Sequence, residues 1–149
     1  MDSSDFDELE AMVMADARKE FSETVLDHAM NPRNVGDMPN ADGFGQLQAR
    51  CGDIRIWLKV KDGAVEKATF QTDACGCTVA CASMATELAK GKTIADAGRI
   101  NQEDITKALD GLPNDQRHCA LEAAKTLKNA VENYMTNQRE PWKKIYGNR

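Results

Sequence analysis

The sequence predicts an α+β fold in which a small three-stranded antiparallel sheet is packed by helices. Three observations indicate this class. Side chains at 54–61 alternate between apolar and polar, which is typical of a strand with one buried face. Asp62-Gly63 is a strong hairpin signal and joins that strand to another at 64–72. The second half of the chain has helical patterning, and strands followed by helices favour the α+β class.

The first part of the chain predicts one helix and then a loop before the sheet. Apolar side chains recur at helical spacing over residues 4–30, and the helix should end there because the residue before Pro32 avoids the α conformation. Glycine, proline and asparagine are dense over residues 31–45, which predicts a loop. A further strand around residues 44–49 would complete the sheet.

The second half predicts four helices. The first covers residues 77–90 and stops at Gly91, and the second is a short helix over 94–97 capped by Thr93. Asn101 and Asp104 form a capping box for a helix that ends near residue 109. The last and longest helix, residues 115–136, should bury one stripe of side chains. That stripe consists of Leu121, Ala124, Leu127, Val131 and Tyr134.

Composition limits the classes of function. A length of 149 residues fits one domain, and a net charge of −5 argues against nucleic acid as the main ligand, because phosphate binding needs a surplus of Lys and Arg. No apolar run approaches the roughly 18 residues that span a bilayer. The first ten residues are acidic and lack Arg, unlike a secretory or transit peptide, so the expected location is cytoplasmic. Five cysteines in a reducing compartment favour metal or thiol chemistry over disulfides.

Three cysteines are candidates for a metal site because each lies at the boundary of a predicted element. They are Cys51, before a strand, Cys75, before a helix, and Cys119, in the first turns of the last helix. Thiolates suit zinc, copper(I) and iron–sulfur clusters. A helix N-terminus and the neighbouring Arg117 should lower the pKa of the Cys119 thiol.

The other candidates have simpler explanations. Cys77 and Cys81 are four residues apart on one helix face and can serve as small apolar packing residues. Asp53 alone would usually be a turn residue, and His118 alone a surface histidine. His28 fits an interaction with the end of its own helix. Spacing alone is therefore suggestive, because no CxxC repeat is present.

Several motifs together resemble the IscU/NifU-type family of iron–sulfur cluster scaffolds. The resemblance begins with residues 25–28 (VLDH) and 31–36 (NPRNVG). It continues through Cys51-Gly52-Asp53, Cys75-Gly76-Cys77 and His118-Cys119. It extends from about residue 21 to residue 134, in the family's order and spacing. We therefore expect a scaffold domain over residues 21–137, an N-terminal helical extension over 1–20 and a C-terminal tail over 138–149.

The resemblance implies a non-enzymatic scaffold that builds a [2Fe–2S] cluster and donates it to recipient apo-proteins. Its implied ligands are Cys51, Asp53, Cys75 and Cys119. A cysteine desulfurase would supply sulfur as a persulfide, with Cys119 as the acceptor, and His118 matches an alternative ligand, notably to zinc. Cys77 and Cys81 stand where the family usually has serine. Residues 112–116 read LPNDQ where bacterial members have Leu-Pro-Pro-Val-Lys for chaperone docking, so a dedicated Hsp70-type chaperone is not predicted.

Two rival interpretations stay open at this point. One is a structural zinc module that uses Cys51, Cys75, Cys119 and either Asp53 or His118. The other is an enzyme, but the sequence offers neither a CxxC redox motif nor a general base beside the proposed metal. The sequence does not decide between [2Fe–2S] and [4Fe–4S], nor between a monomer and a homodimer. It predicts neither a nucleic acid nor a membrane as a partner.

Overall fold

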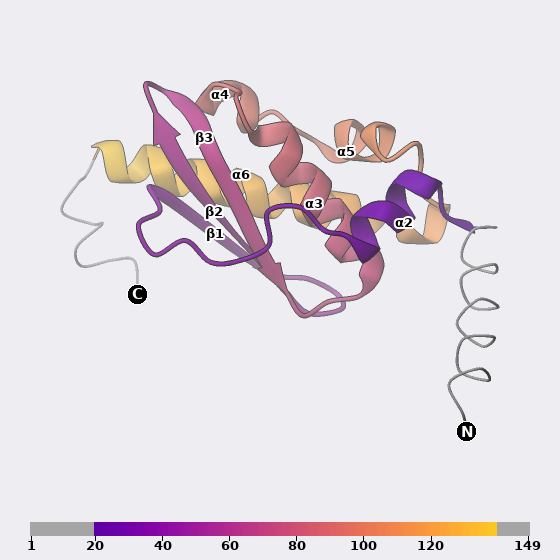
Figure 1. Ribbon diagram of the computed structural model, residues 1–149. Helices are drawn as coiled ribbons and strands as arrows, with labels where there is room; N and C mark the ends of the chain where they lie inside the picture. Colours follow the sequence, from indigo (N-terminus) through magenta and orange to yellow (C-terminus); the bar gives the residue numbers. More distant parts are fainter. Residues whose placement is uncertain (1–19, 140–149) are drawn as a thin grey trace.

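The predicted α+β architecture is confirmed by the computed structural model, which describes residues 20–139 (Figure 1). The elements in chain order are α2 (Glu23–Met30), β1 (Gly43–Gln48), β2 (Asp53–Lys61), β3 (Ala64–Thr72), α3 (Gly76–Ala89), α4 (Ile94–Ala97), α5 (Gln102–Ala108), the 3₁₀ turn η1 (Asn114–Gln116) and α6 (Arg117–Arg139). The expected N-terminal extension, apart from residue 20, lies outside the described residues, as does the tail beyond residue 139. Within the described part, no helix is long and apolar enough to cross a membrane.

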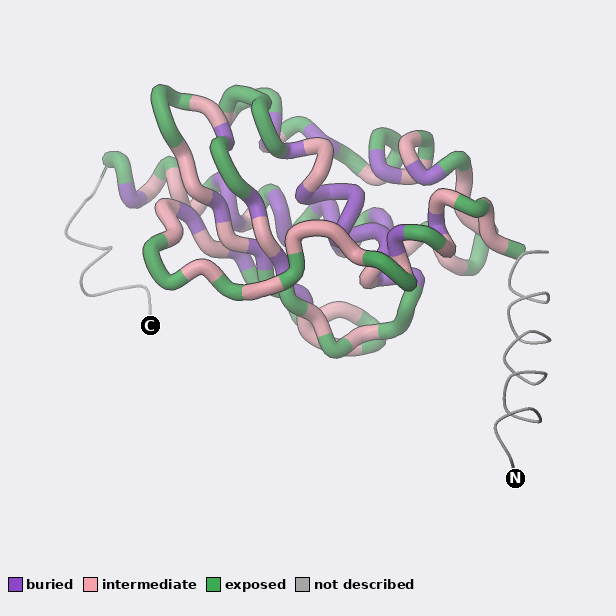
Figure 2. Tube along the Cα trace, viewed as in Figure 1, coloured by how far each residue is buried: buried purple, intermediate pink, exposed green. Residues whose placement is uncertain are grey.

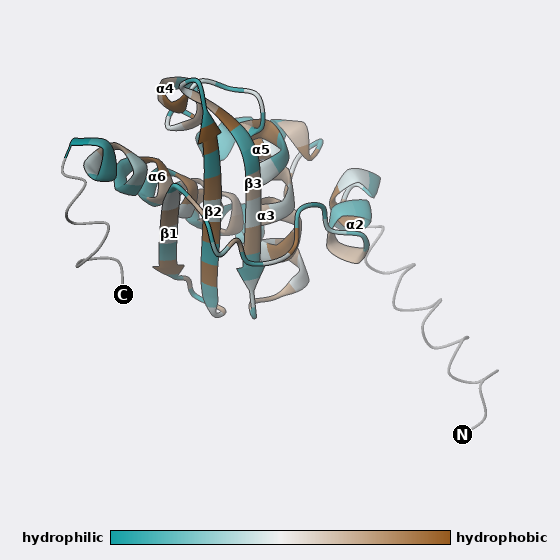
Figure 3. Ribbon diagram, turned by 60° about the vertical axis from the view of Figure 1, so that its left-hand side comes forward, coloured by the Kyte–Doolittle hydropathy of each residue, from teal (hydrophilic) through white to brown (hydrophobic). Residues whose placement is uncertain are grey.

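The sheet is antiparallel with the order β1-β2-β3, and its register follows the alternation in the sequence. Ile56 at the centre of β2 lies opposite Gly45 of β1 and Phe70 of β3. Asp62 and Gly63 both have positive φ, as expected for a tight hairpin turn that matches the strand twist. Figure 3 shows the resulting bands of apolar and polar residues along β2 and β3.

Helices α3 and α6 cover one face of this sheet, and the core lies between the layers (Figures 1 and 2). Ile54, Ile56 and Leu58 of β2 are fully buried there, and Ala68 and Phe70 of β3 lie on the same face. Strand β1 approaches α6 so closely that a Cβ atom on Gly45 would collide with the backbone of Thr126 and Ala130. A side chain at residue 45 would therefore push the sheet away from the helix.

The prediction of one continuous helix over residues 4–30 is wrong. The chain leaves the helical conformation at residues 21 and 22, and α2 begins afterwards. Ser22 causes the break, because its hydroxyl accepts the N–H of Val25 at 3.1 Å as an N-cap and donates to the carbonyl of Leu109. Helical periodicity continues across the cap, so the sequence pattern did not reveal it.

The predicted helices after the sheet are all present. Asn101 and Asp104 form the expected capping box of α5, and Thr93 caps α4. The last helix begins two residues later than predicted and continues to residue 139. Of its predicted stripe, Ala124, Leu127 and Val131 are buried, whereas Leu121 is 38% exposed and Tyr134 is only half-buried. Ala120, Ala123 and Ala130 of α6 are also fully buried, and their small side chains allow the close approach of neighbouring elements.

Candidate thiol site

The three predicted cysteine ligands come from three separate segments of the fold, namely the β1–β2 turn, the start of α3 and the start of α6. Figure 1 shows these elements. Cys51 lies in the turn between β1 and β2, which is closed by hydrogen bonds between the backbones of Ala49 and Gly52. Cys75 is the N-cap of α3, but its sulfur makes no capping hydrogen bond. Cys119 is the third residue of α6. The fold therefore brings together side chains that are up to 68 positions apart, from 51 to 119.

The thiols of these segments lie close enough for one to shift the pKa of another. The pKa of Cys51 is raised, first by contact with the Cys75 thiol and then, more weakly, by Cys119 and Glu122. All five cysteines are free thiols, with Cys51 and Cys75 exposed and Cys119 buried. Within residues 20–139, no group of three or more His, Cys, Asp or Glu side chains is already arranged to hold a metal ion. Metal binding would therefore need side-chain rotation, for which the two exposed thiols have room.

The expectation that Cys119 has a lowered pKa is wrong. Contact with the Cys77 thiol, followed by burial, raises the pKa of Cys119 above its usual range, although Thr78 and Cys75 act in the opposite direction. The helix N-terminus is present as predicted, but these contacts outweigh its effect. The Cys119 thiol also donates to Oε1 of Gln116 at 3.6 Å and lies 3.7 Å from Nε2 of His118.

Cys77 belongs to the same thiol group, whereas Cys81 lies deeper. The contact with Cys119 favours the Cys77 thiolate, but the contact with Cys81 and burial prevail and raise the pKa of Cys77 to about 12. Cys81 is fully buried in the core, as the packing explanation predicted. Cys77 also lines a cavity of about 330 Å³ between α2 and the start of α3. The other residues lining this cavity are Phe21, Val25, Leu26, Ala29, Cys75, Gly76 and Gln116.

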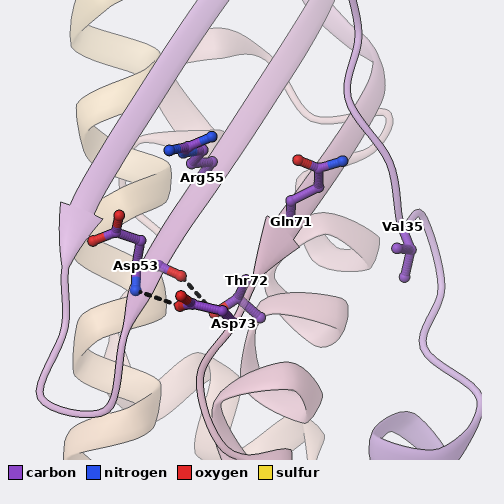
Figure 4. A pocket seen from close by; sticks show the side chains of 6 residues that line it. All are labelled: Val35, Asp53, Arg55, Gln71, Thr72 and Asp73. Atoms are coloured by element: carbon purple, nitrogen blue, oxygen red, sulfur yellow. Dashed lines mark hydrogen bonds between the residues drawn. The ribbon is translucent and has the colours of Figure 1, made fainter.

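Asp53 lies beside the thiols in sequence, but its side chain is on the outer face of the sheet. Figure 4 shows it with Arg55, Gln71 and Asp73 around an open cavity of about 420 Å³. To join a thiol-bound metal, the Asp53 carboxylate would have to rotate towards the Cys51 turn.

Asp73 and Thr72 hold the backbone of this turn, and the sequence reasoning missed both. Oδ1 of Asp73 accepts the N–H of Asp53 at 2.8 Å, and Thr72 Oγ1 donates to the carbonyl of Asp53 at 2.6 Å (Figure 4). Gly52 has a φ of +156°, which residues other than glycine rarely adopt, and a Cβ there would also meet the Asp73 carboxylate. The available signal was a Thr-Asp pair just before Cys75, a combination that often hydrogen-bonds nearby backbone.

His28 has a structural role that was also missed. It is buried, and Nδ1 lies 2.7 Å from Oγ of Ser83, so it links α2 to α3. The same hydroxyl accepts the backbone N–H of Arg33 at 2.9 Å. Burial lowers the pKa of His28, with a smaller effect from the Arg33 charge in the same direction. The predicted interaction with the end of its own helix is not what holds this side chain.

The arrangement of fold and thiols agrees with comparisons to known proteins. The family model for the NifU-like N terminal domain matches residues 20–141, and the chain belongs to this family. The chain is 46% identical over 116 residues to the iron-sulfur cluster assembly scaffold protein IscU 1 of Archaeoglobus fulgidus, covering 76% of each chain. It is 40% identical over 124 residues to IscU of Escherichia coli (strain K12), covering 79% of this chain and 96% of the relative.

A solved structure shows the same fold. The N-terminal NifU-like protein from Brucella abortus superposes with a TM-score of 0.60 at 17% identity, covering 76% of this chain and 93% of that one. At this identity the likeness concerns the fold alone. The resemblance inferred from the sequence motifs is confirmed by the family match and by the relatives.

Proposed function

We propose that this protein is a scaffold on which an iron–sulfur cluster is assembled before transfer to apo-proteins. The observation that carries the proposal is the proximity of free thiols from the β1–β2 turn, the start of α3 and the start of α6, two of them exposed at the surface. Relatives that match most of the chain are named as iron-sulfur cluster assembly scaffold proteins. Soft thiolates are the preferred protein ligands of such clusters. We propose no enzymatic activity for this site.

We further propose a [2Fe–2S] cluster held by Cys51, Cys75, Cys119 and Asp53. The exposed thiols would bind iron at the surface, and Cys119 would complete the site from below after side-chain rotation. Sulfur would arrive from a cysteine desulfurase as a persulfide on Cys119. Because Cys119 is buried, the transfer needs local opening near the cavity of about 330 Å³ that Gln116 lines.

Asp53 is the ligand we expect to release first. A carboxylate oxygen is harder than a thiolate and is a poorer match for cluster iron. The position of its side chain on the outer face of the sheet supports this role, because the bound orientation has to be gained by rotation. Asp53→Ala should therefore keep the cluster longer and donate it more slowly to an apo-ferredoxin. Unchanged transfer kinetics would remove Asp53 from this role.

Anaerobic reconstitution with iron and sulfide, followed by Mössbauer spectroscopy, tests the proposed scaffold. The wild type should turn brown and show the spectrum of a [2Fe–2S] cluster. Serine variants of Cys51, Cys75 and Cys119 should each lose most of it, whereas Cys81→Ser serves as a matched buried control and should retain it. Loss confined to Cys81→Ser, or a colourless wild type, would contradict the proposal.

A structural zinc site is the second candidate, and one observation favours it. His118 Nε2 lies 3.7 Å from the sulfur of Cys119, so an imidazole is available where zinc would accept it. Under this alternative, the protein would bind zinc in the same assay and stay colourless with iron and sulfide. Because zinc and a cluster would share the same thiols, zinc in a purified sample would not decide between them.

The remaining features of the proposal concern location and partners. Free thiols persist in a reducing compartment, which supports a cytoplasmic location. A homodimer that shares one cluster is compatible with the exposure of Cys51 and Cys75. Residues 112–116 include the turn η1, in which Asn114 and Asp115 are exposed. We propose no dedicated Hsp70-type chaperone that binds this segment.

A further inference from the structure

The Cys77 thiol is not a ligand of the cluster proposed above. Cys77 follows the α3 N-cap by two residues, and Cys77 and Gln116 line the same cavity. Gln116 lies 3.6 Å from the sulfur of Cys119 on α6, the helix that packs against α3, and the Cys77 and Cys119 thiols shift each other's pKa. Cys77 and Cys119 are therefore held as a pair by the fold and do not depend on loop positions.

The surroundings of Cys77 differ from those of an ordinary packing cysteine. Cys81, one turn further along α3, is fully buried and needs no other explanation. Cys77 is 9% exposed and lines the cavity of about 330 Å³ together with Gln116. Gln116 in turn accepts the S–H of Cys119 at 3.6 Å. The cavity wall, Cys77 and Cys119 are thus connected by direct contacts, and a small product such as hydrogen sulfide has space to leave.

We propose that Cys77 resolves the persulfide on Cys119 and thereby releases sulfide inside the scaffold. This step rests on the proposed function, because it starts from sulfur bound to Cys119. The sulfur atoms of a cluster are sulfide, whereas the outer sulfur of a persulfide is zero-valent. Some group must therefore supply two electrons for each sulfur delivered.

The step is balanced with the groups that the site holds. The sulfur of Cys77 attacks the inner sulfur of the Cys119 persulfide, so a Cys77–Cys119 disulfide bond forms and the persulfide bond breaks. The electron pair leaves with the outer sulfur, which takes the Cys77 proton and departs as hydrogen sulfide. The outer sulfur is reduced, and the two cysteine sulfurs are oxidised to the disulfide. A dithiol reductant, of the chemical class of dithiothreitol or a small redox protein, then restores both thiols.

The test follows sulfide release from the reduced full-length protein after removal of free reductant. Inorganic polysulfide is the probe, because it can load Cys119 without a desulfurase. In the wild type we expect sulfide to appear together with a Cys77–Cys119 disulfide, identified by mass spectrometry of non-reduced peptides. In Cys77→Ser the persulfide should persist on Cys119 and sulfide release should slow by roughly tenfold or more, because the attacking group is no longer held beside its target.

Cys81→Ser is the matched control, with the same chemical change one helical turn away, and it should release sulfide like the wild type. Release from Cys77→Ser at the wild-type rate would overturn the proposal. So would a disulfide between other cysteines, or the absence of polysulfide loading on Cys119. Failure of the scaffold function would appear separately, as a colourless protein in the reconstitution with iron and sulfide.

Discussion

Asp73 holds the turn that carries Cys51 and Asp53, and its truncation gives the sharpest test of how the site is built. Its carboxylate accepts the backbone N–H of Asp53 at 2.8 Å and packs against Gly52. Asp73→Ala removes this acceptor without adding bulk. We expect the turn to lose part of its order while the sheet, the helices and the thiols themselves stay in place.

The free energy that the turn should lose follows from the removal of one charge-assisted hydrogen bond at an exposed position. Such bonds contribute about 1.5–3 kcal/mol when protected, but here water can replace the carboxylate, so we expect roughly 1 kcal/mol. Since 1.4 kcal/mol corresponds to about tenfold, this loss means about a fivefold larger population of the disordered turn. The reconstituted cluster should therefore be lost about fivefold faster, while the midpoint of thermal unfolding falls by only about 2–4 °C.

The assay measures the half-life of the cluster's visible absorbance in the presence of an iron chelator, beside thermal unfolding of the cluster-free protein. Asp73→Asn is the matched control, because its amide oxygen can still accept the N–H of Asp53, and it should stay close to the wild type. A wild-type half-life in Asp73→Ala would show that this hydrogen bond does not order the ligands. An equal loss in Asp73→Asn would assign the effect to charge instead of geometry.

Two further predictions concern the packing that supports the site. Gly45→Ala should lower the free energy of unfolding, measured in urea, by about 3 kcal/mol, because its Cβ would meet the α6 backbone. Gly76→Ala is the control and should not destabilise the protein, because its Cβ would meet only the Ala29 Cβ at 3.9 Å. His28 has a lowered pKa, so its contribution to stability is present above its ordinary value of 6.5 and is lost as the pH falls below it. His28→Gln should flatten this pH dependence in urea unfolding, and an unchanged slope would contradict it.

The sheet could be predicted from the sequence because the information that defines it is local. Ile54, Ile56 and Leu58 alternate with polar residues, and Asp62-Gly63 fixes the hairpin, so the face and the register follow from neighbours along the chain. The capping box at Asn101 is equally local. Membership of the NifU-like N terminal domain family could also be inferred, because it rests on the order of short motifs.

What could not be predicted depends on residues that are distant in sequence. The break before α2 involves Ser22 and the carbonyl of Leu109, 87 positions away, and no periodicity in the first thirty residues reveals that contact. The pKa of Cys119 was predicted with the wrong sign for the same reason. Its helix position is visible in the sequence, but the Cys77 thiol that outweighs it comes from another helix.

The depth of each thiol in the fold suggests why the site has more cysteines than a cluster needs. Cys51 and Cys75 are exposed on turns, where a metal ion can reach them and where their side chains have room to rotate. Cys119 and Cys77 are buried on two helices that pack against each other, α6 and α3, where a reaction between the two thiols is favoured. Iron would thus be gathered at the surface, and sulfur would be held and reduced below it. We therefore expect the cluster to form between the exposed and the buried thiols, where the turn that Asp73 holds meets the start of α6.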